Sequence, residues 1–574
     1  MSAPMRCWSG TITCCAISAR EALGCYSGNL CGVTASSEFV AKTGQATGPA
    51  GTAQPGASAR RRRWLTAAGW VAGTAALFGC YLGLASTRAV NSDGASQALQ
   101  AWDMLHGNLL LRGWGLTDVS FYTTELPQYM LVDLIRGLHA DVVDVAAAMT
   151  YTLVVVLAAL LAKGTATGRE ALVRVLVTAG IMLAPQLATG TNVLLSSPDH
   201  IGTTVPVLVV WLILDRARAR RWVPVVAGLV LAWVTVADTL VLYIGVLPLA
   251  LVCAIRVFRA VAADKQPVKS QWYTVSLGAA ALAGGLVGEL ALHLIESHGG
   301  FRTWAPVAKL APPAQLPHHL HVAAEGLLLL GGADPFGRPV TAGTAVLLLH
   351  LVGVVLAGWA VVFAIWRFLR DLDLVDQVLV SAVVINLVAY VISTQASAVI
   401  YTREIAAVLP FSAVLAGRLL ARRLVAARFA PVLLLVLAGY LGGFAYEVAQ
   451  PAVPPQNQQL TSFLAAHHMH TGLSGYWEAN VVTLTSSDAV QIRQVWVVGG
   501  RVVPYHTEYK SDWYDPHQSS ANFVVLTRAA TSEYPGFTAR RAVLATFGPP
   551  AHVYDVGSRY QVLVWNKNLL GDLH

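Results

Sequence analysis

The sequence predicts a polytopic α-helical membrane protein with about 11 transmembrane helices and a small extracytoplasmic C-terminal domain of the α/β or α+β class. Of the 574 residues, 55% are hydrophobic and only 12% are charged, and the mean hydropathy is +0.56. A soluble domain carries about 25% charged residues, so an ordinary soluble protein is excluded. The net charge of +8 arises from short basic clusters beside apolar runs. This pattern is typical of cytoplasmic loops and argues against nucleic-acid binding.

Residues 1–63 are expected to form a disordered cytoplasmic tail, because they are rich in Gly, Ser, Thr and Ala and contain no long apolar run. Five of the seven cysteines lie in the first 31 residues without a C-x-x-C pair. A reduced tail and a start codon placed too early are both compatible with this composition. The arginines at 60–63 directly precede the first apolar span, which predicts a cytoplasmic N-terminus.

Eleven apolar segments approach or reach the roughly 20 residues that a helix needs to cross a bilayer. They are 65–88, 144–162, 171–190, 201–215, 222–237, 239–258, 273–297, 343–366, 374–393, 404–421 and 430–447. With alternating direction, every dense basic cluster falls on the cytoplasmic side, which supports this count. Asp238 interrupts the stretch 222–258, which we interpret as two spans joined by a tight outer turn. One long tilted span there would invert everything that follows.

The alternation predicts a transmembrane domain over 64–447 and an extracytoplasmic soluble domain over 448–574. The segments of the transmembrane domain that are predicted to lie outside the membrane on the same side as the soluble domain are 89–143, 191–200, the turn at Asp238, 298–342 and 394–403. Outer loop 89–143 is expected to contain helices over 96–105 and 125–138. Outer loop 298–342 holds an apolar segment, 325–330, which is too short to span and is expected to be interfacial or re-entrant.

The C-terminal segment differs in composition from the apolar part. A helical run is predicted over 459–470, followed by short β-branched runs bounded by Gly, Asp and Pro. These predicted strands are 481–484, 492–498, 523–526, 551–556 and 560–565.

Asp93 is the candidate catalytic residue, because it is a carboxylate at the outer end of the first span and at the root of a structured loop. Its alternative role is to cap the helix that follows. Arg403, with Tyr401 before it, opens the tenth span and is the candidate phosphate-binding residue. A guanidinium binds phosphate through paired hydrogen bonds. The alternatives for Arg403 are an ion pair with Glu404 and simple extension toward water.

Several other polar residues accumulate on the same predicted side, and ionisable groups near membrane depth tend to mark sites because they are costly there. The further candidates for the cavity are Asp118, Tyr122, Glu125, Asp199, His200, Asp238, Glu289, His293 and Glu404. Asp199 and His200 suit a proton relay, a metal site or a helix start. Glu289 and His293 share one helix face with Glu296, which we interpret as a polar stripe facing the bundle interior rather than a metal site.

These residues resemble those of the C-type membrane glycosyltransferases that use polyprenyl-phosphate sugars, closest to the aminoarabinose-transferase and protein-mannosyltransferase branch. The resemblance covers roughly 64–574, mostly as topology. It is carried by Asp93 with the run SQALQAWDMLHG after it, by YTREIAAVLP at 401–410, and by GYWEAN at 475–480. Asp93 is followed by Gly94, where many members of the family have a second acidic residue. Because of this departure, it stays open whether the site binds a divalent metal.

The resemblance implies an inverting sugar transfer outside a bacterial cytoplasmic membrane, to a cell-envelope glycan, lipid or protein. Asp93 would be the general base and Arg403 would hold the phosphate of the lipid-linked donor. No nucleotide would be needed, and the sequence contains no Gly-rich loop that would cradle one. Two other classes stay open: a transporter or flippase of lipid-linked glycans, and a non-catalytic membrane protein that binds envelope glycans through its C-terminal domain. A transporter is expected to show related halves, and no internal repeat is evident.

Overall fold

The structure is a computed structural model that describes residues 57–573 apart from 186, 188, 218, 305–307, 338, 339, 341, 427–429, 455, 456 and 529–535. Leu65–His574 forms one compact unit. Most of the expected tail, including its five cysteines, lies outside the described residues. Its last residues, 57–63, belong to the first helix, in keeping with the high helix propensity of arginine.

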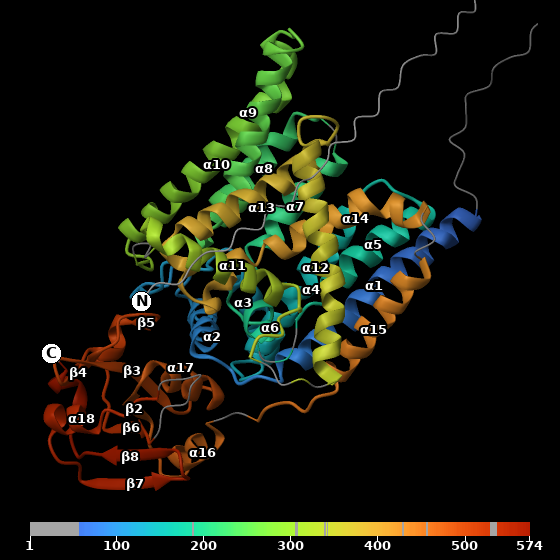
Figure 1. Ribbon diagram of the computed structural model, residues 1–574. Coiled ribbons are helices and arrows are strands. Elements are labelled where there is room, and N and C mark those ends of the chain that lie inside the picture. The colour runs from blue at the N-terminus through green and yellow to red at the C-terminus, as the bar shows by residue number, and fades with distance from the viewer. Residues whose placement is uncertain are drawn as a thin grey trace, which may run out of the picture. The chain divides into compact units, whose positions relative to one another are not determined.

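Most of the described chain forms a bundle of helices (Figure 1). The helices are α1 (Ala57–Ala85), α4 (Val142–Lys163), α5 (Gly168–Ile181), α6 (Thr189–Leu194), α7 (Thr204–Arg216), α8 (Trp222–Ala237), α9 (Leu247–Ala262), α10 (Trp272–Ser297), α11 (Leu316–Leu330), α12 (Ala342–Arg367), α13 (Leu374–Ile392), α14 (Val408–Ala426) and α15 (Ala430–Val448). Helices α8 and α10 pack backbone to backbone. A Cβ at Gly284 would lie 2.5 Å from the Gly228 oxygen, so small residues are required at this contact.

Seven described helices are long and apolar enough to cross a membrane. An eighth span results if the 3₁₀ helix Val399–Ile405 (η5) and α14, which are bent by 54°, are one broken span. These helices agree with a multi-pass helical membrane protein. Three expected spans correspond to α5, α7 and α8, which have only 14, 13 and 16 residues. Because a full crossing needs about 20 residues, the count of about 11 stays a prediction.

Arg418 on α14 ties together the ends of three neighbouring helices. Its guanidinium pairs with Asp215 at the end of α7 at 2.9 Å, and with Asp373 and Asp376 at the start of α13 at 2.5 Å each. It also donates a hydrogen bond to the Leu161 carbonyl near the end of α4, at 3.1 Å. These chain segments are among those that the basic clusters place on one side of the membrane.

Three contacts show how the stretch 222–258 runs through the bundle. Asp238, which follows α8, contacts His200 at the opposite end of α7 from the Arg418 pairs. Arg256 near the end of α9 contacts Gln377 and the Leu372 carbonyl, beside the carboxylates that hold Arg418. The chain therefore passes from one end of the bundle to the other between 238 and 256, as the interpretation with two spans requires.

Residues 89–143, the predicted first outer loop, contain both helices that the sequence predicts. They are α2 (Ser92–Leu105) and α3 (Leu126–Arg136), with a short strand, β1 (Trp114–Gly115), between them. On α3, Leu131, Leu134 and Ile135 are exposed while Val132 is buried. An amphipathic helix of this kind can lie along a membrane interface.

The C-terminal segment contains a mixed sheet of six strands in the order β4-β3-β2-β6-β8-β7, in which β2 runs parallel to β3 and β6. The strands of this segment are β2 (Thr471–Ser474), β3 (Gln491–Val498), β4 (Arg501–Pro504), β5 (Tyr509–Lys510), β6 (Phe523–Thr527), β7 (His552–Val556) and β8 (Tyr560–Val564). Its helices are α16 (Gln458–Ala466), α17 (Tyr476–Thr485) and α18 (Arg540–Phe547). Strand β5 pairs with β1 rather than with this sheet.

One local prediction was wrong. The expected strand 481–484 lies inside α17, because packing of α17 against β3 and α2 overrides the strand preference of Val481 and Val482.

The apolar segment 325–330 is the end of α11, which has 15 residues and packs against η5. Its interfacial or re-entrant placement stays a prediction.

We predict that Arg418→Ala will destabilise the protein by about 3–5 kcal/mol, because it removes the cation that three neighbouring carboxylates share, and only Asp215 keeps a second ion pair, with Arg216, among the described residues. Arg418 is only 7% exposed, so water replaces the lost partner poorly. The measurement is the thermal unfolding midpoint of the protein in detergent. The matched control is Arg422→Ala, which removes an arginine on the same helix that is 79% exposed and pairs with Glu170. It should cost less than about 1 kcal/mol. Equal losses in the two variants would contradict the structural role of Arg418.

Candidate functional site

Asp93 lies in the first turn of α2, but it does not cap that helix. Asn91 is the N-cap, and its side-chain oxygen accepts a hydrogen bond from the Gly94 amide at 2.8 Å. The Asp93 carboxylate is therefore available for another role. Because it lies in the first turn of the helix, the helix dipole also stabilises its negative charge.

Packing explains why the residue after Asp93 is a glycine. A Cβ at this position would lie 2.5 Å from Val143 Cγ1 and 2.6 Å from the Ser197 carbonyl oxygen. The backbone of α2 approaches α4 and the 197–200 segment too closely for any side chain here. A second carboxylate next to Asp93 is therefore excluded by packing.

The C-terminal segment contacts Asp93 directly. Tyr476, the first residue of α17, donates its phenolic O–H to Asp93 Oδ1, and its oxygen lies 2.6 Å from Glu508 Oε2. Burial raises the pKa of the Glu508 carboxyl well above its usual range, and the Asp93 carboxylate raises it further. A phenol has one proton, so Tyr476 can donate fully to only one of these two carboxyl groups at a time. The raised pKa of Glu508 favours a neutral Glu508 carboxyl, which could share a proton with Tyr476. Glu508 has φ 51°, an uncommon backbone conformation for a residue other than glycine.

A buried histidine forms the second part of the site. His200 Nδ1 lies 2.9 Å from Asp238 Oδ2, and His200 Nε2 lies 3.3 Å from Glu404 Oε1. Burial lowers the pKa of His200, but the two carboxylates raise it more, so the net pKa is well above the usual range. Both ring nitrogens therefore donate and the imidazole is held as a cation. Thr203 donates a further hydrogen bond to Asp238.

Arg403 on η5 lies within electrostatic range of Asp199, Glu404 and Asp93. The structure gives Glu404 a direct partner in His200, and it gives Arg403 no ion pair among the described residues. The Arg403 Nε is buried and has no hydrogen-bond partner in the described part of the chain. The alternative of a simple Arg403–Glu404 ion pair is therefore not what is observed.

Asp199, Glu125 and Asp118 complete the cluster. Burial raises the pKa of Asp199 to about 6, although Arg403 and His200 lower it. Glu125 accepts a hydrogen bond from the Asp199 amide at 3.2 Å, and burial raises its pKa well above the usual range. Burial, and then Glu404, raise the pKa of Asp118. A carboxyl held in this way is neutral at a higher pH than usual, which reduces the excess of negative charge around Arg403.

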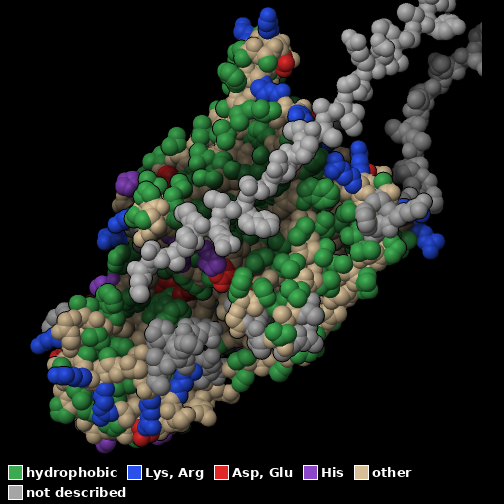
Figure 2. Space-filling view, viewed as in Figure 1, with side chains coloured by type: hydrophobic (Ala, Val, Ile, Leu, Met, Phe, Trp, Pro, Cys, Tyr) green, Lys and Arg blue, Asp and Glu red, His purple; other side chains and the backbone are tan. Residues whose placement is uncertain are grey.

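Most of the residues predicted for the site lie together in the structure, and some lie elsewhere. Asp93, Asp118, Glu125, Asp199, His200, Asp238 and Glu404 gather around Arg403 and Tyr401. Figure 2 shows a hollow near the middle of one face with acidic and histidine side chains at its edge. Tyr122 does not belong to the cluster, because its hydroxyl donates to the Leu109 carbonyl at 2.7 Å and its ring packs on Phe301.

The prediction that a polar stripe on α10 faces the bundle interior was wrong. Glu289 and His293 are exposed, so this face points away from the bundle interior, and only Glu296 turns back to accept hydrogen bonds from Thr303. Spacing along a helix predicts which residues share a face but not where that face points. Glu508 contacts the candidate site through Tyr476 but was not among the predicted residues, and no local pattern around it could have singled it out.

No protein-family model matches the chain, and no curated protein sequence is significantly similar to it. Among the described residues, no group of three or more His, Cys, Asp or Glu side chains is placed to hold a metal ion. Cys80 and Cys253 are both free thiols.

We predict that Glu508→Gln will weaken the pH dependence of stability. Because the folded pKa of Glu508 is raised, the folded protein binds this proton more tightly than the unfolded chain does. The group therefore costs stability as the pH rises from the unfolded pKa, about 4.3, toward the folded pKa. The measurement is the unfolding midpoint between pH 5 and pH 8 in detergent, where the variant should lose less stability than the wild type. Glu289→Gln, which removes an exposed carboxyl outside the cluster, should behave as the wild type does. A Glu508→Gln curve parallel to the wild-type curve would contradict a shared proton at Tyr476.

Proposed function

We propose that the protein is an inverting glycosyltransferase that moves a sugar from a polyprenyl-phosphate donor to an acceptor hydroxyl outside a bacterial cytoplasmic membrane. The observation that carries this proposal is the position of Arg403. Its side chain is half-buried, its Nε is buried without a hydrogen-bond partner among the described residues, and it lies within electrostatic range of Asp93. Such a guanidinium can bind a phosphate, and such a carboxylate can take the proton of a reacting hydroxyl.

The surrounding elements support a donor that enters from the membrane. Arg403 lies on η5, at the bend that precedes the apolar helix α14. Helix α11 from the 298–342 segment packs against η5, where a Cβ at Gly326 would lie 2.6 Å from the Thr402 hydroxyl oxygen. A lipid phosphate at Arg403 would therefore have apolar helices beside it for its chain and the polar cluster in front of it for its sugar.

In the proposed reaction, Asp93 accepts the proton of the acceptor hydroxyl while that oxygen bonds to the anomeric carbon. The bond between the anomeric carbon and the phosphate oxygen breaks on the opposite face, and its electron pair leaves with the polyprenyl phosphate. Arg403 stabilises the phosphate as its charge grows. Tyr476 holds Asp93 Oδ1, so Oδ2 is left to face the acceptor.

The cation at His200 has a positioning role in this scheme. Held between Asp238 and Glu404, it keeps Glu404 away from a direct pair with Arg403. The guanidinium then has its hydrogen bonds left for a ligand. This arrangement resembles preorganised electrostatic sites, in which the protein fixes the charges before the substrate binds.

We predict that Asp93→Asn will lower sugar transfer by at least about a hundredfold, because a positioned general base contributes roughly 10²–10⁴ to the rate. The assay incubates purified protein with a panel of radiolabelled polyprenyl-phosphate sugars and membrane-derived acceptors, and it follows loss of the lipid-linked sugar. Asp264→Asn, at an exposed position outside the cluster, is the matched control and should keep full activity. An unchanged unfolding midpoint shows that the Asp93 variant is folded. Near-normal transfer by Asp93→Asn would remove this residue from the mechanism.

We predict that Arg403→Ala will weaken binding of the lipid-phosphate donor by at least about tenfold, because a charged hydrogen bond contributes about 1.5–3 kcal/mol. Arg403→Lys keeps the charge but loses the paired geometry, so it should fall between the wild type and Arg403→Ala. Donor affinity is measured by binding of a non-hydrolysable polyprenyl-phosphonate sugar to protein in nanodiscs. Arg422→Ala serves as the control at an exposed site. An unchanged donor affinity in Arg403→Ala would refute the assigned role.

A further inference from the structure

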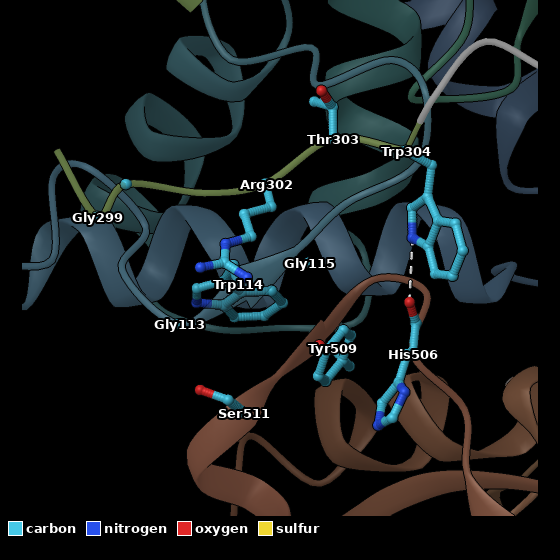
Figure 3. Close-up of a pocket in the computed structure, with 11 residues that line it drawn as sticks. Gly113, Trp114, Gly115, Gly299, Arg302, Thr303, Trp304, His506, Tyr509 and Ser511 are labelled. Carbon is cyan, nitrogen blue, oxygen red and sulfur yellow. Dashed lines mark hydrogen bonds between the residues drawn. The ribbon is translucent and has the colours of Figure 1, made fainter. Parts of the chain in front are cut away.

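A cavity of about 490 Å³ opens between the first outer loop, the start of the 298–342 segment and the C-terminal segment (Figure 3). It is separate from the cluster around Arg403, and none of the predicted site residues lines it. Its volume falls in the range of small-molecule binding sites. The side chains that characterise it are Trp114, Arg302, Thr303, Trp304, His506 and Tyr509.

Backbone pairing makes the walls of this cavity rigid. Strand β1 pairs with β5 on one side, and on the other side the Arg302 amide donates to the Trp114 carbonyl at 3.0 Å. A Cβ at Gly115 would lie 2.3 Å from the Tyr509 ring, so only glycine allows this close approach. The Trp304 indole N–H donates to the His506 carbonyl at 3.1 Å, which links the remaining wall to the C-terminal segment (Figure 3).

The lining combines aromatic faces with hydrogen-bonding side chains. Trp304 is 53% exposed, and the structure anchors both its indole N–H and its backbone amide. Arg302 and His506 are exposed beside it and Thr303 is half-buried, and none of the lining side chains is acidic. A sugar ring has an apolar C–H face and a rim of hydroxyls, so it fits an aromatic face flanked by hydrogen-bonding groups. A lipid tail would not need the polar groups.

Helix α2 connects this cavity to Asp93. The helix begins beside Asp93 and, near its other end, Asp103 accepts hydrogen bonds from the Trp114 indole at 2.8 Å and from the Lys510 ammonium at 3.2 Å. Ten residues of α-helix rise by about 15 Å. The cavity and the carboxylate are therefore separated by a distance that a few linked sugar units can cover.

We infer that this cavity binds an oligosaccharide, and that it holds the distal sugars of the acceptor chain. The second part of this inference rests on the proposed function, whereas carbohydrate binding itself does not. Trp304 supplies the stacking face, and Arg302 and His506 supply hydrogen bonds to hydroxyls or to an acidic sugar.

The test measures binding of fluorescently labelled linear hexasaccharides to the full-length protein in detergent, without any donor. The panel consists of glucose, mannose, galactose, arabinose and galacturonate hexamers. At least one should bind, and Trp304→Ala should weaken its binding by about tenfold or more, as expected for loss of an aromatic anchor. Trp304→Phe keeps a ring and should weaken binding less. The matched control is Trp496→Ala, an indole that is 49% exposed and lies outside the cavity lining.

Failure of all the hexasaccharides to bind would overturn the inference, and so would equal binding by the Trp304→Ala and Trp496→Ala variants. The proposed function is judged separately by turnover of the lipid-linked donor. If a hexasaccharide binds through Trp304 but no donor is consumed, the proposed function fails and the carbohydrate site stands. If donor is consumed and Trp304→Ala binds hexasaccharide normally, the acceptor chain lies elsewhere.

Discussion

Ionic charge buried at the two ends of the helical bundle is the constraint on which the rest of the structure depends. Removing an ion from water costs several kcal/mol, so each buried charge needs partners that are already in place. Arg418 meets this requirement with three carboxylates at one end of α7, and His200 meets it with two at the other end. The partners come from helices distant in sequence. The clusters therefore fix how α7, α13 and α14 lie relative to one another.

The two clusters differ in a way that bears on function. Arg418 is matched by direct ion pairs on its guanidinium, as expected for a residue that holds helices together. Arg403, at the other end, is surrounded by charge but keeps a buried Nε without a partner among the described residues. A group left partly unsatisfied in an otherwise compensated site is costly for folding alone. A bound anion would satisfy it.

The C-terminal segment is part of the candidate site and does not simply cover it. Tyr476 contacts both Asp93 and Glu508. Strand β5 pairs with β1, and the carbonyl of His506 accepts a hydrogen bond from Trp304. Through these contacts the segment positions the proposed general base and builds one wall of the proposed carbohydrate site. The mixed sheet behind them supplies a rigid support. Binding loops supported by a rigid scaffold are common in proteins.

Hydropathy and the turn residues determined the helical, multi-pass character of the chain and most elements of the C-terminal sheet, whereas the side of the membrane that each loop occupies stays a prediction from the basic clusters. These are local properties, since each depends on residues within one helix or strand. The same information placed most of the candidate residues on one side, and they do meet there. Only the tertiary structure decided that Glu289 and His293 face outward, that Tyr122 is bonded elsewhere, and that Glu508 reaches Asp93 through Tyr476. The direction of a helix face and the pairing of distant side chains are set by packing between elements, and no short stretch of sequence encodes them.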